Sequence, residues 1–368
     1  MTNEVGQAPR CVAFHLPQFH PIPENDLWWG RGFTEWTNVA SARPVVPGHH
    51  QPHLPADLGF YDLRLPEARS AQAELASRYG VDAFCYYHYW FSGRRVLERP
   101  VDAIVASGQP DFPFCLCWAN EDWTRTWDGR SGEVLLHQEY SDADDLAHIR
   151  HLLPTLADRR YLRVGGRPLL LVYRTELMPE PKRTADLWRG EAARAGLGDL
   201  YLVRVESFVA DVDPAGIGFD AAVEFAPDWR RVRAGLLQRV REMAARLRLQ
   251  PRGYREHRFA DYTRLVAGML AKPDPGYRRI RCVTPGFDNS PRRRKDALIL
   301  SGSTPAAYGE WLRRVLEEEA ARPVPVDEKL VFVNAWNEWA EGNHLEPCQR
   351  WGRAYLEAHA AARRGAAA

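Results

Sequence analysis

The sequence lacks the features that mark several large classes of protein. No apolar run approaches the roughly 20 residues that a membrane-spanning helix needs, and the first ten residues are polar, without the apolar stretch of a secretion signal. Lys and Arg total 49 against 48 Asp and Glu, which leaves a formal net charge of +1 and provides no basic surface for nucleic acid. We therefore expect a cytoplasmic protein with no integral membrane segment and no nucleic-acid partner.

Cysteine is also scarce, with six in 368 residues and no CxxC spacing. That number is too small for a disulfide scaffold, and the spacing gives no support to a structural zinc site. Five of the cysteines lie in apolar, strand-like runs: Cys11, Cys85, Cys115, Cys117 and Cys282. We expect them to be buried free thiols.

Motifs for metal ligands and for a serine nucleophile are missing as well. The sequence has no HExxH and no GxSxG. Five histidines lie near the start of the chain without ligand spacing, and hydroxyl-binding or structural roles are favoured for them: His15, His20, His49, His50 and His53. We expect neither a metal nor a cofactor.

Aromatic residues, by contrast, are plentiful, with 13 Trp, 14 Tyr and 14 Phe. Several of the tryptophans stand in short polar segments such as WANEDW (residues 118–123) and WNEW (residues 336–339). Trp among Asn, Asp and Glu suits a site that stacks on apolar ring faces while it hydrogen-bonds hydroxyls, which is the surface character of a sugar. The composition therefore favours an oligosaccharide or polysaccharide as the ligand.

Short apolar runs typical of strands recur eight times, with helical segments between them. The runs are residues 11–16, 81–87, 114–118, 168–173, 200–205, 221–225, 280–284 and 330–334. The helical segments are residues 65–79, 96–107, 143–156, 184–195, 255–271, 304–321 and 352–362. This alternation predicts an α/β fold, a single parallel (β/α)8 barrel of the TIM type. A doubly wound sheet competes, but no glycine-rich phosphate loop follows the first run.

We expect one catalytic barrel domain over residues 11–362, with flexible tails at residues 1–10 and 363–368. Residues 21–65, rich in Trp and His, form a long insertion after the first strand that we expect to cover the barrel mouth as a lid. A second insertion, residues 228–262 after the sixth strand, contains an arginine-rich helical stretch whose charges indicate a solvated face.

In a barrel of this type the chemistry lies at the C-terminal ends of the strands. The candidate substrate-binding residues follow the predicted strands, apart from Trp36 in the lid: His15, His20, Tyr87, His88, Tyr89, Trp90, Trp118, Asn120, Glu121, Trp123, Tyr173, Glu206, Glu224, Asn334, Trp336 and Trp339. A single carboxylate in such a position, such as Glu206, is more often an ion-pair or helix-cap partner than a catalyst.

Glu338 and Glu341 are the candidate catalytic residues. They lie three positions apart where the eighth strand passes into a turn, and this spacing can direct both side chains into one pocket. Two carboxylates among Trp and Asn are the minimum equipment for cleaving a glycosidic bond. The alternative is that they cap a helix.

Five motifs, in order, resemble those of the WbsX-like family of polysaccharide-locus proteins, which is related to family 99 of the glycoside hydrolases. They are FHLPQFH (residues 14–20), GFTEWTN (32–38), YYHYW (86–90), WANEDW (118–123) and NAWNEWAEG (334–342). The resemblance covers residues 12–356 and implies a (β/α)8 barrel. WbsX-like proteins are often described as glycosyltransferases, whereas the family 99 enzymes are retaining endo-α-mannosidases.

The resemblance also implies roles for the two glutamates. Glu338 corresponds to the base that acts on the 2-hydroxyl of the sugar, and Glu341 to the acid/base that protonates the leaving oxygen. The implied route passes through a 1,2-anhydro sugar and requires a 2-hydroxyl trans to the leaving group, as in α-mannosides and α-rhamnosides. The lid and the YYHYW segment depart from the mannosidase pattern, so the sugar and the linkage do not transfer.

Two other functions remain open from the sequence. A glycosyltransferase would need a diphosphate site, often a DxD motif with a metal or a basic cradle; Asp211 and Asp213 have that spacing, but the Pro214 that follows favours a turn or a helix cap. A glycan-binding protein without catalysis would not need both glutamates. The sequence makes no prediction of the oligomeric state.

Overall fold

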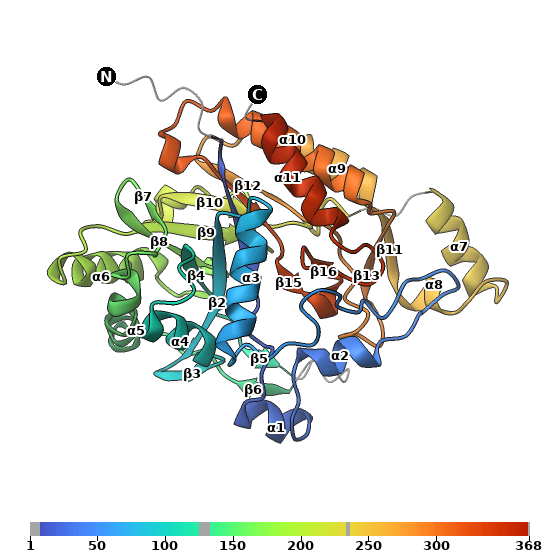
Figure 1. The fold of residues 1–368 in the computed structure, drawn as a ribbon, viewed down its shortest axis with the longest axis horizontal. Helices are drawn as coiled ribbons and strands as arrows, with labels where there is room; N and C mark the ends of the chain where they lie inside the picture. The colour runs from blue at the N-terminus through green and yellow to red at the C-terminus, as the bar shows by residue number, and fades with distance from the viewer. Residues whose placement is uncertain (1–7, 125–132, 233–235, 367–368) are drawn as a thin grey trace.

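Eight parallel strands close into a barrel, which confirms the fold class expected from the sequence. The structure is a computed structural model that describes residues 8–124, 133–232 and 236–366. The strands follow one another around the barrel in the order β1-β14-β12-β10-β9-β8-β4-β2, and β2 pairs again with β1 (Figure 1). Their bounds are β1 (Arg10–His15), β2 (Ala83–Phe91), β4 (Phe114–Trp118), β8 (Arg167–Val172), β9 (Tyr201–Glu206), β10 (Ala221–Glu224), β12 (Arg279–Val283) and β14 (Leu330–Val333).

Helices surround this barrel and connect its strands. They are α3 (Pro66–Arg78), α4 (Arg99–Ser107), α5 (Asp142–Leu156), α6 (Pro181–Arg194), α9 (Tyr262–Leu270), α10 (Pro305–Ala320) and α11 (Ala354–Ala366). Between β9 and β10 the connection contains the 3-10 helix η2 (Pro214–Ile217) in place of an α-helix. None of the helices in the described part of the chain has the length and apolar character needed to cross a bilayer.

Short strands and 3-10 helices lie in the loops that connect the barrel elements. They are β3 (Arg94–Val96), β5 (Trp123–Thr124), β6 (Val134–Leu136), β7 (Arg163–Val164), β15 (Asn337–Glu338) and β16 (Asn343–His344), with the 3-10 helices η1 (Thr175–Leu177), η3 (Val326–Glu328) and η4 (Trp339–Glu341). β15 and β16 form an antiparallel pair around η4. The two candidate catalytic glutamates thus lie on a short hairpin that follows β14.

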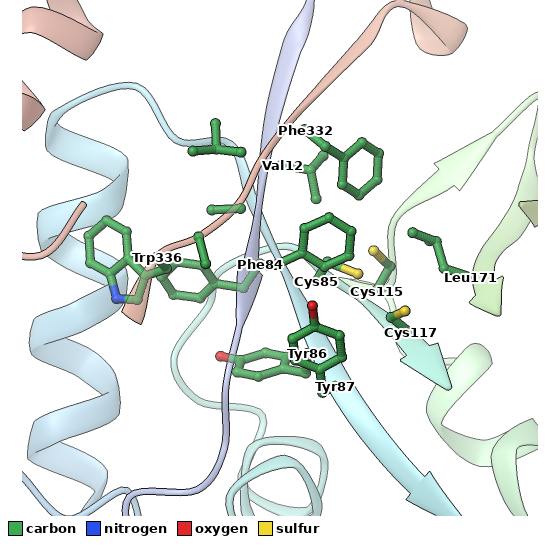
Figure 2. Close-up of a cluster of buried hydrophobic side chains, with 14 of the residues drawn as sticks. Val12, Phe84, Cys85, Tyr86, Tyr87, Cys115, Cys117, Leu171, Phe332 and Trp336 are labelled. Carbon is green, nitrogen blue, oxygen red and sulfur yellow. The ribbon is translucent and has the colours of Figure 1, made fainter. Parts of the chain in front are cut away.

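Residues on each barrel strand alternate between the interior and the helix-covered outside. On β2, Phe84 points toward α3 and lies with its ring centroid 5.1 Å from that of Trp336, whereas Cys85 points toward Cys115 and Cys117 (Figure 2). All six cysteines are buried free thiols, which confirms the expectation for the five in apolar runs. The same alternation decides which side chains of β2 reach the barrel mouth.

The insertion after β1 carries α1 (Pro23–Trp29) and α2 (Glu35–Ser41), both at the lower edge of the view in Figure 1. Trp36 fixes this insertion to the barrel. Its Nε1 donates to the carbonyl oxygen of Tyr61 over 2.8 Å, and its ring centroid lies 5.6 Å from that of Trp339. Aromatic packing therefore holds the lid in place.

The insertion after β10 is not the simple helical segment that the sequence suggests. It contains α7 (Leu236–Arg246), α8 (Gly253–Glu256) and β11 (Arg258–Asp261), so the single helix expected over residues 255–271 is wrong. β11 pairs with β13 (Leu298–Ser301), a strand that was not expected, and Asp261 then caps α9 by accepting from the backbone N–H of Arg264. Pairing between segments 40 residues apart leaves no trace in helical periodicity.

α7 projects from the barrel at the right of Figure 1. Its Arg239, Arg241 and Arg246 are exposed, as expected for a solvated face. Met243 on the same helix is also 61% exposed. The helix is attached through Ala245, which is buried in a small cluster with Tyr254.

Both chain ends are more ordered than expected. Arg10 belongs to β1 and pairs with Leu330, while residues 1–7 lie outside the described residues. Arg363, on α11, donates to the Asp82 carboxylate and to the carbonyl oxygen of Pro9. The tail expected over residues 363–368 is therefore wrong for residues 363–366, because these contacts continue the helix; residues 367–368 lie outside the described residues.

The contact between the two insertions gives a stability test. A Cβ atom on Gly253 would lie 2.1 Å from the carbonyl oxygen of Val45, so Gly253→Ala forces the lid backbone away from α8. We expect a loss of roughly 1–3 kcal/mol in the free energy of unfolding, measured by denaturant titration. Gly276→Ala is the matched control, because a Cβ at that position would have no atom within 4 Å. Equal stability of the two variants would contradict the contact.

Candidate functional site

A cavity of about 300 Å³ opens at the C-terminal ends of the barrel strands. This is the end of a parallel barrel at which loops supply the chemistry. The residues that line it come from the lid, from the barrel strands and from the loops: Leu16, Gln18, Asn25, Trp29, Tyr87, Tyr89, Ala119, Glu121, Asp122, Trp123, Thr124, Leu135, Tyr173, Phe225, Arg292, Asn334, Glu338 and Glu341. Both candidate catalytic glutamates are among them.

One arginine joins three carboxylates in this cavity. Arg292 donates from Nη2 to Glu338, from Nη1 to Glu341 and from Nε to Glu35, over 2.8, 2.8 and 2.7 Å. Arg292 follows β12, Glu35 lies on the lid helix α2, and the other two lie on the hairpin after β14. The guanidinium therefore uses all three nitrogens to draw distant parts of the chain together.

Burial raises the pKa of Glu338 to about 8 and raises the pKa of Glu341 above its usual value, because the site removes most of the water around both carboxylates. Arg292 opposes this effect on both, whereas the charges of Glu341 and Glu35 add to it on Glu338. The pair therefore retains a proton at a pH where ordinary glutamates have lost theirs. Protonated and ionised carboxyls can then coexist near neutral pH.

Residues behind the pair fix its position. Asn337 accepts from the backbone N–H of Leu16 over 2.7 Å and donates to its carbonyl oxygen over 3.0 Å, which ties the hairpin to the end of β1. Glu346 accepts hydrogen bonds from Tyr61, Gln72 and Trp339. Burial raises the pKa of Glu346 to about 7, although these donors lower it. The hairpin, the lid and α3 are thus linked through buried polar groups.

Asn25 lines the cavity with a side-chain amide that has no hydrogen-bond partner among the described residues. It lies on the lid helix α1, it is fully buried, and neither its amide nitrogen nor its amide oxygen has a hydrogen-bond partner among the described residues. Oε2 of Glu35 is also buried and unpartnered there. Unpaired buried polar groups are costly, and a ligand with several hydroxyls would satisfy the amide of Asn25, which lines the cavity.

Among the residues expected to bind substrate, six line the cavity: Tyr87, Tyr89, Glu121, Trp123, Tyr173 and Asn334. Aromatic rings form much of its wall. The ring centroids of Tyr87 and Tyr173 lie 6.1 Å apart, and those of Tyr89 and Trp123 lie 5.2 Å apart. Glu121 pairs with Arg174.

Other aromatic candidates face α5 on the outside of the barrel. His88 Nε2 lies 3.0 Å from His148 Nε2, and Trp90 Nε1 donates to Asp144 over 2.9 Å. The Trp118 ring centroid lies 4.7 Å from that of His148. His88 and Trp90 alternate along β2 with the two tyrosines of the cavity, because successive side chains point to opposite faces of a strand.

The first two histidine candidates and Asn120 also lie outside the cavity. His15 is buried against α3 with Nε2 3.2 Å from Gln72 Oε1, and burial lowers its pKa to about 3. His20 is buried with neither ring nitrogen partnered among the described residues, and burial lowers its pKa to about 4. Asn120 bridges the backbone N–H and carbonyl oxygen of Arg174, so it holds two loops together.

Glu206 and Glu224 serve the barrel wall as ion-pair partners. Glu206 lies 3.0 Å from Arg279, and Glu224 lies 3.2 Å from Lys272. Both side chains are buried beside these cations. Neither glutamate lines the cavity.

The remaining tryptophan candidates pack against neighbouring elements instead of lining the cavity. Trp336 is buried against Phe84. Trp339 stacks on His344 with ring centroids 3.8 Å apart and also contacts Trp36. In the lid it is Trp29, not Trp36, that lines the cavity.

The DxD spacing has a structural role. Asp211 accepts from Arg279 over 2.7 Å and from Arg230 over 3.2 Å, while Asp213 caps η2 by accepting from the backbone N–H of Ala215. Among the described residues no group of three or more His, Cys, Asp or Glu side chains is arranged to hold a metal ion.

Sequence reasoning missed Arg292 and Asn25 as residues of the site. Arg292 stands in a run of basic residues after Asn289, which has the composition of a solvated loop. Its position could have identified it as a candidate, because it follows the seventh barrel strand and so lies at the same end of the barrel as the glutamates. Asn25 lies in a lid whose folding the sequence does not reveal, whereas the aromatic composition of that lid made its tryptophans, Trp29 among them, candidates for stacking on a sugar.

The shared arginine can be tested directly. Arg292→Gln removes the positive charge that favours the ionised carboxylates, so we expect the pKa of Glu338 and of Glu341 to rise by about one to three pKa units. Arg292→Lys keeps the charge and should raise them less. Titration of the glutamate carboxyl carbons by carbon-13 NMR measures the change.

Arg294→Gln provides the control for that titration, because it makes the same charge change on an exposed side chain of the same loop. It should leave both pKa values close to those of the wild type. Unchanged or lowered pKa values in Arg292→Gln would contradict the role given to the arginine.

Known proteins resemble this chain in sequence and in structure. Residues 11–359 match the model of a family described as glycosyltransferase WbsX. Proteins described as uncharacterized protein WxcX, from two strains of Xanthomonas campestris pv. campestris, B100 and ATCC 33913, are each 48% identical over 347 residues, which is 94% of this chain. The chain spans about half the length of these curated relatives, 48% of each.

Solved structures share the fold at low identity. A GH99 endo-α-mannosidase from Bacteroides thetaiotaomicron aligns with a TM-score of 0.55 at 14% identity over 97% of this chain and 98% of its own. A glycoside hydrolase-like protein aligns with a TM-score of 0.60 at 12% identity over 98% and 95%. At such identities the likeness concerns the barrel fold alone. The match to the family model over most of the chain shows that the protein belongs to the WbsX glycosyltransferase family.

Proposed function

We propose that the protein is a retaining glycoside hydrolase that acts on α-mannoside-like or α-rhamnoside-like linkages of a bacterial polysaccharide. The observation that carries the proposal is the pair of buried Glu338 and half-buried Glu341, joined by Arg292 in an aromatic-walled cavity at the C-terminal end of the barrel strands. Aromatic walls and unpartnered polar groups together match the two kinds of surface that a sugar presents.

The proposed reaction passes through a 1,2-anhydro sugar. Glu338 takes the proton of the 2-hydroxyl, O2 then forms a bond to C1, and the bond from C1 to the leaving oxygen breaks as Glu341 gives that oxygen its proton. Water next attacks C1 and the bond from C1 to O2 breaks, while Glu341 accepts the proton of the water and Glu338 returns its proton to O2. Two inversions at C1 retain the configuration of the sugar.

The electrostatics of the site keep one proton on the pair near neutral pH, and because the pKa of Glu338 is raised to about 8, the assigned roles require that this proton reside on Glu341 when substrate is bound. A raised pKa makes Glu338 a stronger base toward a hydroxyl once it is ionised, and Arg292 is the group that favours its ionised form. The carboxyl of Glu341 has its pKa raised by burial, which favours the protonated form that an acid needs. We therefore expect activity to be highest between the two macroscopic pKa values of the pair, above the range of an ordinary glutamate and below about 8.

Transfer of the sugar to another hydroxyl is the second candidate function. The description of the matching family as a glycosyltransferase favours it, and an acceptor hydroxyl could replace water in the second step. Assays of α-linked aryl glycosides with and without nucleotide sugars distinguish the two: hydrolysis without a donor supports the first, and strict dependence on a nucleotide sugar supports the second.

The two glutamates should respond differently to leaving-group quality. We expect Glu338→Gln and Glu341→Gln each to lower kcat/KM by roughly 10²–10⁴-fold on a glycoside with a poor leaving group, with little change in melting temperature. A dinitrophenyl glycoside, whose leaving group needs no proton, should restore much of the activity of Glu341→Gln and none of that of Glu338→Gln.

The control for these kinetics is Glu357→Gln, which makes the same change on an exposed residue of α11 and should behave as the wild type. A 2-deoxy substrate should not be cleaved, because it has no hydroxyl for the anhydro sugar. Wild-type turnover in both catalytic variants would contradict the proposal.

Substitution of two lid tryptophans should affect different properties, substrate binding for Trp29 and stability for Trp36. Trp29 lines the cavity, so we expect Trp29→Ala to raise KM while the melting temperature changes little. Trp36 is buried against Tyr61 and Trp339, so Trp36→Ala should lose about 3–5 kcal/mol of unfolding free energy. Calorimetric melting curves together with steady-state kinetics check both. The reverse pattern would move the sugar contact to Trp36.

A further inference from the structure

A second cavity, of about 450 Å³, lies on the other side of the turn that carries Glu341. It shares no lining residue with the first cavity. Its walls come from the lid (residues 46–50 and 53), from α7 and α8, from residues 285–288 and 299–304, and from the segment that leads into α11. Gly342 forms part of the wall, and the backbone N–H of Asp288 donates to the carbonyl oxygen of Glu341 across it.

The cavity holds positive charge that the protein does not neutralise. Arg241 and Arg350 line it, both are exposed residues, and no ion pair joins either of them to a carboxylate among the described residues. Each guanidinium instead lies over an aromatic ring, Arg241 at 5.4 Å from the centroid of Tyr254 and Arg350 at 5.2 Å from that of Trp351. Stacking of this kind orients an arginine and leaves the edge of the guanidinium free to donate.

Asp288 is the acidic residue that lines this cavity, and both of its carboxylate oxygens already accept hydrogen bonds within the protein. Its Oδ2 accepts from His49 and from Gln51 over 2.7 and 2.6 Å, and its Oδ1 accepts from the backbone N–H of Ser290. His50, also in the wall, has its pKa lowered by burial and further by the neighbouring charge of Arg350. The cavity therefore combines two guanidiniums without an ion-pair partner in the described part of the chain with one carboxylate whose oxygens are already hydrogen-bonded.

The start of a long helix adds to the positive charge around this cavity. Residues 301–304, Ser-Gly-Ser-Thr, line the cavity and lead directly into the 16-residue helix α10, whose first turn is capped by Thr304. The N-terminal end of a helix carries partial positive charge that favours phosphate. Here Pro305 has no N–H and Thr304 accepts from the backbone N–H of Ala307, so the helix contributes mainly through this charge. Gly302 has a φ of +85°, and a Cβ at that position would have no atom within 4 Å, so this turn presents open space to the cavity.

We propose that this second cavity binds a diphosphate group. Two unpaired, stacked guanidiniums offer the planar donor geometry that phosphate oxygens accept, whereas a neutral sugar would leave both charges unpaired. The volume falls within the range of small-molecule sites. The shared chemistry fits a nucleoside diphosphate or a lipid diphosphate, and the binding is independent of the reaction proposed for the first cavity.

Isothermal titration calorimetry of the full chain with inorganic pyrophosphate tests the proposal. We expect saturable binding to the wild type, weakened roughly tenfold or more in Arg241→Gln and in Arg350→Gln, because each loses a charge-assisted hydrogen bond. Arg246→Gln is the matched control: it makes the same charge change on an exposed residue of α7 that does not line the cavity. Melting temperatures confirm that each variant is folded.

Uridine diphosphate and farnesyl diphosphate, tested in the same way, distinguish the two sources, since tighter binding of one than of pyrophosphate identifies it. Glu338→Gln should bind pyrophosphate as the wild type does, so a failure of the proposed reaction leaves this test intact. Absence of saturable binding, wild-type affinity in both arginine variants, or an equal loss in Arg246→Gln would overturn the proposal.

Discussion

The ion cluster around Arg292 is the interaction on which the site depends. Three carboxylates from the lid and from the hairpin after β14, two of them buried, would repel one another without a cation between them. Burying charged groups is costly unless they are paired and hydrogen-bonded, and this guanidinium satisfies that condition with three nitrogens. Closing the lid over the barrel and placing Glu338 beside Glu341 are consequences of the same contact.

Strand periodicity explains how far the sequence predicts this structure. The eight apolar runs predict the barrel because each carries buried strand formers between helical segments, and the fold depends on that local pattern. The list of strand-end candidates mixes two faces: Tyr87 and Tyr89 reach the cavity, whereas His88 and Trp90 turn to α5. Which face points inward is set by pairing with neighbouring strands, and the sequence of one strand does not contain it.

Contacts between segments far apart in the sequence account for the features that the sequence did not predict. Arg292 meets Glu35 across 257 positions, and a basic run in a loop has the same composition whether it is solvated or buried. Local pattern likewise predicts a helix over residues 255–271, where pairing of β11 with β13 overrides it. Glu206 and Glu224 follow the ordinary expectation for a buried carboxylate, since each is paired with a cation in the wall.

The turn from Trp339 to His344 separates the two cavities and belongs to both. Gly342 has a φ of +56°, and a Cβ there would lie 3.0 Å from the Cβ of Asp288, so only glycine allows the loop after β12 to approach so closely. On one side of the turn Glu341 meets Arg292; on the other His344 lines the second cavity and stacks on Trp339. The backbone N–H of Asp288 also donates to the carbonyl oxygen of Glu341. The acid of the first cavity and the wall of the second therefore share one short stretch of backbone, which this close approach of two loops holds in place.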